Sequence, residues 1–271
     1  MAKSRDLPPS TLDELKRNLE RLKLLAILAY LDQAVEQASS LEQGYVTFLA
    51  GLIDRQVLAN TESGAQRRIK SAGFPSVKTF DTFDWHFQKN LNVQLVKDLT
   101  TLHCIQQARP IIILGCPGTG KTHMSIAFGV LAANSGYSVL FFSVARLLAQ
   151  LYASLADGTT DRLISRLAKP DLLILDDLRA IPTKPEYASL LFDLIDARYT
   201  KRCTIVSSNL SVKIWGKVLG NVALTASLVD RLMDRAHVIN IRNGRSWRSD
   251  GPEAPPEGDR PADLGVDPED P

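Results

Sequence analysis

Residues 115–123, GCPGTGKTH, combine the residue types and the spacing that hold a phosphate chain. They fit the pattern G-x-x-x-x-G-K-T and follow an apolar run at 111–114. The glycines permit backbone conformations that turn successive N–H groups toward phosphate oxygens, and the N-terminus of a following helix adds partial positive charge. Lys121 is expected to reach the β- and γ-phosphates, and the Thr122 hydroxyl to bind Mg²⁺. A chance glycine turn is the alternative, but the complete motif between a predicted strand and helix favours a nucleoside triphosphate site. Its expected residues are Gly115, Cys116, Pro117, Gly118, Thr119, Gly120, Lys121, Thr122 and His123.

A second candidate for chemistry is the stretch LLILDDL at 172–178, in which two carboxylates follow a buried apolar run. Asp176 is expected to hold Mg²⁺ through water, and Asp177 to orient or deprotonate the attacking water. This is the arrangement of phosphoryl transfer, which works by positioning and electrostatics. Two solvated acids at a strand end are the alternative. The distance of about 50 residues from the phosphate loop favours the catalytic interpretation.

Two further features complete the expected site. Asn209 ends the stretch SSN, where its amide could polarise water or contact the γ-phosphate, although an asparagine there could also serve a turn. Arg231 and Arg235 stand four residues apart on one predicted helix. Either could act on a neighbouring subunit's nucleotide as an arginine finger, and the alternative is a solvated or salt-bridged surface arginine.

The elements that must position these residues follow from the apolar pattern. Short apolar runs separated by helical segments predict a parallel sheet covered by helices on both faces, an α/β fold. Strands are expected at 111–114, 138–143, 172–175, 203–207 and 237–241, and helices notably at 121–134, 144–155 and 187–200.

The chain before the sheet reads as helical. An amphipathic helix is predicted over 10–40, a second over 45–58 and a short basic one over 66–70, together forming a helical N-terminal domain over 1–74. Residues 75–92 are aromatic-rich without clear periodicity and are interpreted as a linker. A helix resumes at 93–108, and the nucleotide-binding domain is expected over 93–248.

Composition limits the protein's environment and partners. The 271 residues are 45% apolar, contain no stretch that predicts a membrane span, and begin without a signal-peptide pattern. Three cysteines without metal-ligand spacing fit reduced thiols, so a cytoplasmic protein is expected.

Charge is distributed unevenly along the chain. Residues 249–271 hold eight acids, one arginine and six prolines, which predicts a disordered tail of net charge −7. The other 248 residues carry +9. That excess suits a polyanionic partner or simply a soluble surface.

Taken in order, these features resemble the AAA+ family, and in particular the IstB-like transposition helper ATPases of insertion sequences, within the DnaA/DnaC helicase-loader clade. The resemblance runs from about Leu22 to Arg248. The phosphate-loop motifs identify only nucleotide hydrolases, whereas other segments are specific to IstB-like proteins. These are LKLLAILAYLDQA, FDTFDWHFQ, DRLMDRAHVINI and the closing NGRSWR.

The resemblance implies a five-stranded parallel AAA+ sheet preceded by a helical domain. It also implies ATP-dependent assembly of a homo-oligomer on DNA and stimulation of a partner transposase. By motif position, Arg231 corresponds to the arginine-finger region and Asn209 to the first sensor, and Arg248 is a candidate second sensor. Two departures stand out: Asp176–Asp177 replaces the commoner Asp-Glu, so slow hydrolysis is expected, and Arg179 follows beside the site.

Three functions are compatible with these features. The first is an ATP-regulated oligomer that binds duplex DNA through its phosphates without sequence readout and helps a transposase. The second is a DnaC-like loader of a replicative helicase. The third is a nucleotide hydrolase without a nucleic-acid role, such as a small-molecule kinase, which the absence of an evident acceptor domain disfavours. The candidate DNA contacts are Lys16, Arg17, Arg67, Arg68 and Lys70.

Overall fold

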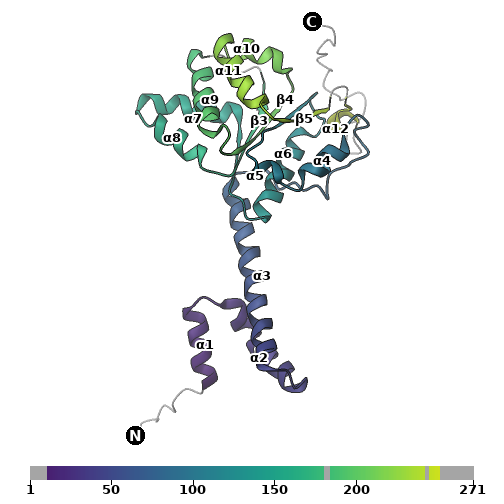
Figure 1. Cartoon of the computed structure of the whole chain (residues 1–271), viewed down its shortest axis with the longest axis vertical. Coiled ribbons are helices and arrows are strands. Elements are labelled where there is room, and N and C mark those ends of the chain that lie inside the picture. The colour runs from purple at the N-terminus through teal and green to yellow at the C-terminus, as the bar shows by residue number, and fades with distance from the viewer. Residues whose placement is uncertain (1–10, 180–183, 242–243, 251–271) are drawn as a thin grey trace. The chain divides into compact units, whose positions relative to one another are not determined.

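The computed structural model describes residues 11–179, 184–241 and 244–250, and Figure 1 shows their elements. The chain divides into two compact units, Met1–Arg67 and Arg68–Pro271. Each is described by itself below. The tail predicted to be disordered lies outside the described residues from 251 onward.

The first unit is helical, as expected, but its first helix is interrupted. Helix α1 spans Thr11–Arg21 and α2 spans Leu25–Ser40, where a single helix over 10–40 was predicted. Lys23 between them adopts a left-handed conformation, with φ of 58°. Gln56 accepts hydrogen bonds from the first backbone N–H groups of α2, at 3.1 Å from Ala26 N and 3.3 Å from Ile27 N. This side chain satisfies donors that a new helix start leaves exposed.

Helix α3 spans Tyr45–Ala72 without a break, where two separate helices over 45–58 and 66–70 were predicted. No proline stands between these limits, and the helix accommodates Gly51 and Gly64 at a modest cost in propensity. The boundary between the two units falls within α3, so its last residues, among them Ile69 and Ala72, pack in the core of the second unit.

The second unit is built on a five-stranded parallel sheet in the order β2-β3-β4-β1-β5. The strands confirm the predicted set within a few residues at each end. They are β1 Ile111–Gly115, β2 Val139–Ser143, β3 Leu172–Leu178, β4 Cys203–Ser208 and β5 His237–Ile241.

Strand side chains alternate between two hydrophobic cores, which is why the strands read as continuous apolar runs. Ile111 and Ile113 enter one core, and Ile112 and Leu114 enter the other. Figure 1 shows the helices on either side. The first core is covered by α4 Val93–Leu99, α5 His103–Gln106 and α6 Lys121–Asn134. The second is covered by α7 Val144–Ala156, α8 Thr160–Ala168, α9 Pro185–Arg198, α10 Trp215–Val218 and α11 Val222–Met233.

Two expectations about the segment before the sheet were wrong. The predicted helix over 93–108 is divided into α4 and α5, because Leu102 between them has φ of 61°. Residues 75–92, interpreted as a linker, are part of the second unit and contribute to its first core. Phe83 and Leu91 are buried in its first core, and Phe80 and Trp85 stack there with ring centroids 5.7 Å apart. The aromatic side chains that blurred the periodicity are core residues.

A buried arginine joins the helices of the second core to the sheet. Arg198, the last residue of α9, is 1% exposed and donates to backbone carbonyls at Leu167, Ala168, Pro170 and Cys203. Burial lowers its pKa to about 10. Within the described ranges, no helix is long and apolar enough to cross a membrane.

Candidate functional site

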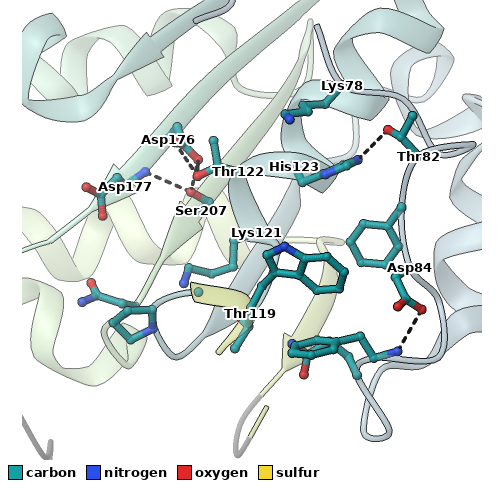
Figure 2. Close-up of a pocket in the computed structure, with 18 of the residues that line it drawn as sticks. Lys78, Thr82, Asp84, Thr119, Lys121, Thr122, His123, Asp176, Asp177 and Ser207 are labelled. Atoms are coloured by element: carbon teal, nitrogen blue, oxygen red, sulfur yellow. Dashed lines mark hydrogen bonds between the residues drawn. The ribbon is translucent and has the colours of Figure 1, made fainter. Parts of the chain in front are cut away.

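The carboxyl ends of β1, β3 and β4 open into a pocket of about 700 Å³. Figure 2 shows its phosphate loop, the two acids near the carboxyl end of β3, and a wall contributed by the chain segment before the sheet. In open parallel sheets this edge is where ligands bind. The lining residues of the predicted set are Pro117, Gly118, Thr119, Gly120, Lys121, Thr122, His123, Asp176, Asp177 and Asn209.

The phosphate loop has the geometry of an anion cradle. Gly118 and Gly120 have φ of 78° and 91°, values that L side chains rarely adopt. A Cβ on Gly118 would collide with Ser246, and one on Gly120 would lie 3.0 Å from the Phe83 ring. Backbone conformation and close neighbours therefore both require glycine at positions 118 and 120. It leads directly into α6, whose first residue is Lys121.

Lys121 is held within the loop it follows. Its Nζ donates to the carbonyl oxygens of Gly115 and Cys116, at 2.8 and 2.7 Å. The Thr119 hydroxyl donates to the same Cys116 oxygen at 2.9 Å. These bonds keep the ammonium group at the base of the cradle, where a phosphate would meet it.

The two acids near the carboxyl end of β3 are tied to their neighbours by hydroxyl groups, as Figure 2 shows. Thr122 Oγ1 donates to Asp176 Oδ2 at 2.8 Å, and Ser207 Oγ donates to Asp176 Oδ1 at 2.6 Å. Ser207 Oγ also accepts from the Asp177 backbone N–H at 2.9 Å. The Asp177 carboxylate lies 3.1 Å from Arg179 Nε.

The electrostatics of the site favour a cation beside Asp176. Burial raises the pKa of this carboxyl, while the hydroxyls of Ser207 and Thr122 work in the opposite direction. A buried carboxylate of this kind is stabilised by a metal ion, and a carboxylate with a neighbouring hydroxyl offers the oxygen ligands that Mg²⁺ prefers. The residues present therefore fit a magnesium ion at Thr122 and Asp176.

His123 connects the start of α6 with the wall of the pocket. Its Nε2 lies 2.9 Å from the Thr79 carbonyl, which requires the ring to donate from this nitrogen, and its ring meets Phe83 edge-to-face. Burial lowers the pKa of His123, so the neutral ring is favoured.

One wall of the pocket is aromatic and is built by two segments far apart in the sequence. Phe83 and Phe87 come from the segment before the sheet, and Trp247 begins α12, Trp247–Asp250. Phe87 and Trp247 pack edge-to-face with centroids 4.7 Å apart. Trp247 N donates to the Gly118 carbonyl at 2.9 Å, so the segment after β5 lies directly on the phosphate loop.

A cradle for phosphates, a carboxylate pair and an aromatic pocket at the carboxyl edge of one sheet are what a nucleoside triphosphate requires. The profile of the family described as IstB-like ATP binding protein matches residues 17–251. The chain belongs to this family. It is 34% identical over 235 residues to the ATP-binding protein named for insertion sequence IS21 of Pseudomonas aeruginosa. That alignment covers 87% of this chain and 88% of the relative.

Solved structures agree on the fold of the second unit. AMPPCP-bound DnaA from Aquifex aeolicus is similar with a TM-score of 0.53 and 25% identity, over 62% of this chain and 51% of DnaA. The replication initiator DnaA bound to AMPPCP and single-stranded DNA is similar with a TM-score of 0.51 and 25% identity, over 63% and 51% of the two chains. This member of the IstB-like family is therefore an ATP-binding protein with an AAA+ α/β fold, as the resemblance predicted.

Not every predicted site residue lies in the pocket of this IstB-like protein. Gly115 and Cys116 contribute their carbonyls to Lys121 instead. Arg231, on α11, is outside the set of described residues that line the pocket. Its Nη1 lies 2.7 Å from Asp196 Oδ1, and its guanidinium lies 4.2 Å from the Phe192 ring centroid. The side chain of Arg248 lies outside the described part of the chain.

The expectation that Arg235 shares a helix with Arg231 was wrong. Helix α11 ends at Met233, and Arg235 follows with φ of 53°. The sequence continues apolar at spacings that suit either a helix or the approach to β5, so the end of the helix was not readable. Arg231 alone stays on α11.

The candidate DNA contacts differ in their exposure and in the polar contacts they already make. Arg17, Arg67 and Lys70 are exposed. Lys16 is paired with Asp32 at 2.7 Å, and Arg68 donates from Nε to the Ala133 carbonyl at 2.7 Å. Arg68 therefore has a structural role inside the second unit.

Sequence reasoning missed several pocket residues. Ser207 stands two residues before the predicted Asn209, and Trp247 lies in the closing segment that the resemblance singled out without assigning a role to the ring. The aromatic content of 75–92 was a signal for a packed wall. The other lining residues missed are Lys78, Thr82, Phe83, Asp84, Phe87 and Gln88.

Proposed function

We propose that this protein is a Mg²⁺-dependent ATPase that assembles as a homo-oligomer on duplex DNA and stimulates the transposase of its insertion sequence. The observation that carries the proposal is the convergence of the glycine cradle, Lys121 and the two acids on one pocket, in a chain of the IstB-like family. The name of the IS21 relative refers to an insertion sequence, which favours transposition over helicase loading.

The phosphate end of the pocket supports hydrolysis. Lys121 would neutralise the β- and γ-phosphates, while Thr122 and Asp176 would hold Mg²⁺, which supplies charge neutralisation for the leaving phosphates. Asp177 would orient the attacking water and accept its proton. Asn209 lies at the same pocket and would contact the γ-phosphate. Because Asp177 is shorter than glutamate and is paired with Arg179, turnover is expected to be slow unless DNA or the transposase stimulates it.

The aromatic end supports recognition of the base. Phe83, Phe87 and Trp247 offer flat apolar surface to a purine ring, and Gln88 lines the same pocket with a polar amide. Stacking on such rings favours a base without requiring many polar contacts. We infer that the adenine lies here.

Assembly would be driven by the nucleotide. Arg231 faces α9 rather than its own pocket, so it would reach a γ-phosphate only from a neighbouring subunit. ATP would then complete each subunit interface, and hydrolysis would remove the group that the arginine contacts.

DNA would be held through its phosphates. The exposed Arg17, Arg67 and Lys70 remain candidates, and the groove between α7 and α8 offers two more arginines, Arg162 and Arg166. A DnaA structure similar in fold contains single-stranded DNA, which supports a nucleic-acid role for the fold. Binding through phosphates would weaken steeply with salt and depend little on sequence.

Light scattering with ATP and mixed-sequence duplex DNA tests the proposal. The parent protein should form large complexes that need ATP, and Lys121→Ala should remain a folded protein that neither binds ATP nor assembles. Asp177→Asn should bind Mg²⁺–ATP and give longer-lived complexes, because the water-orienting carboxylate is lost. Normal assembly by Lys121→Ala would refute the proposed ATP site. Complexes of the same size with and without DNA would refute DNA as the partner.

A further inference from the structure

We infer that Ser207 is a positioning residue that sets both acids of the ATPase site through one hydroxyl group. This inference rests on the proposed function. Ser207 lies near the end of β4, is 1% exposed, and donates to Asp176 Oδ1 at 2.6 Å while accepting from Asp177 N at 2.9 Å. One oxygen therefore fixes a carboxylate and the backbone of the residue that follows it.

The strand pairing explains why a hydroxyl is needed at this place. Leu175 pairs with Val206 and Leu178 pairs with Ser208, so the register between β3 and β4 shifts at Asp176 and Asp177. Two residues of β3 thus stand opposite Ser207 alone, as in a β-bulge. Side chains on a regular strand alternate between faces, whereas both acids here line the same pocket.

The bulge leaves a backbone group that must find another partner. Asp177 has φ of 62°, which an aspartate tolerates better than most residues, and its N–H is directed to the Ser207 hydroxyl rather than into the regular ladder. Replacing serine by alanine would leave this donor without its partner and would remove one of the two hydroxyls on Asp176. Both acids would then be free to move from the positions that Mg²⁺ and the attacking water require.

The expected effect is that of losing an outer partner of a metal ligand, which typically costs about 10- to 100-fold in metal affinity or activity. The loss should fall on the metal-dependent part of nucleotide binding. Contacts of the phosphates with the glycine cradle and Lys121 do not involve Ser207, so nucleotide binding without metal should change little.

Ser208 provides a matched control one residue away. Its hydroxyl is also buried at the end of β4, donates to the Leu178 carbonyl and accepts from Leu210 N at 3.0 Å. It therefore joins the same two strands as Ser207 but contacts neither carboxylate. A loss that follows only from a weaker sheet should be shared by both alanine variants.

The test is titration of the full chain with MnCl₂ in the presence of AMPPCP, with free Mn²⁺ followed by electron paramagnetic resonance. AMPPCP binding in EDTA is measured alongside, and thermal melting checks the fold. Ser207→Ala should bind Mn²⁺ about 10- to 100-fold more weakly with unchanged binding in EDTA. Ser208→Ala should behave as the parent, and Ser207→Thr, which restores a hydroxyl, should recover most of the loss.

Each contrary result has a distinct meaning. Unchanged Mn²⁺ binding by Ser207→Ala overturns the inference while leaving the proposed function intact. Equal losses in Ser207→Ala and Ser208→Ala also overturn it, because the serine would then act through the strand alone. If the parent protein shows no metal-dependent AMPPCP binding, the proposed ATPase site itself is refuted, and the role of Ser207 falls with it.

Discussion

The proposed role of Arg231 can be tested through the contacts that hold this side chain within its own subunit. Its guanidinium is paired with Asp196 at 2.7 Å and lies over Phe192 at 4.2 Å. To reach a neighbour's γ-phosphate it must give up these contacts. Asp196→Asn removes the charge of the partner while preserving its size, so it should make Arg231 easier to recruit.

The structure limits the size of this effect. The side chains of Arg231 and Asp196 are 29% and 52% exposed, and ion pairs at such exposure contribute about 0.2–1 kcal/mol. The stacking on Phe192, of the order of 0.5–1 kcal/mol, persists in the variant. Releasing up to about 1 kcal/mol per interface should lower the protein concentration for half-maximal assembly with ATP by up to about fivefold.

The assay is light scattering against protein concentration, with ATP and duplex DNA held constant and low salt throughout. Asp193→Asn is the matched control, since it removes an acid one turn earlier on α9. Burial and the neighbouring acids Asp196 and Asp161 raise the pKa of Asp193. If Asp196→Asn assembles no better than the parent while the control matches the parent, the proposal that Arg231 must release Asp196 to reach a neighbouring subunit is refuted.

Three other outcomes are expected. Arg179→Ala should raise kcat by up to about fivefold in a phosphate-release assay, because an exposed pair holding Asp177 is worth at most about 1 kcal/mol; a tenfold fall would instead assign Arg179 to the triphosphate. Arg198→Met should lower the free energy of unfolding in urea by about 3 kcal/mol, because four buried carbonyls lose a charged donor and this outweighs the relief of burying the cation. The exposed Arg202→Met should change that free energy by less than about 0.5 kcal/mol, and equal effects would contradict the argument. Removing residues 249–271 should leave ATP affinity unchanged, and DNA affinity in a low-salt anisotropy titration should stay the same or rise. Loss of DNA binding would contradict the idea that the acidic tail acts only by electrostatic competition with DNA.

Much of the second unit was predictable because its signals are local. Five apolar runs with helical segments between them specify a parallel sheet, and the glycine motif specifies what lies at its edge. The two acids were identified because they end a buried strand. Their distance along the chain from the phosphate loop supported the catalytic interpretation, and parallel strands bring the two motifs together at their carboxyl ends.

The remainder depended on contacts that periodicity does not encode. A single left-handed residue, Lys23, interrupts a helical pattern that continues on both sides, and no glycine announces the turn. The register shift opposite Ser207 is a property of two paired strands and is invisible in either one. The sequence around Phe83 shows no helical or strand periodicity, because its side chains pack in the first core and line the pocket without forming a regular element.

The two ends of the nucleotide pocket have separate origins in the chain, and this makes recognition modular. The phosphates would meet a continuous motif and two strand ends, whereas the base would meet Phe83, Phe87 and Trp247, which are supplied from either side of the sheet-forming region. Phe83 also packs against Gly120 of the cradle, whereas the rings of Phe87 and Trp247 can change without altering the cradle or the two acids. Preference for one purine over another could therefore be redesigned at these two rings while the phosphate-binding residues stay the same.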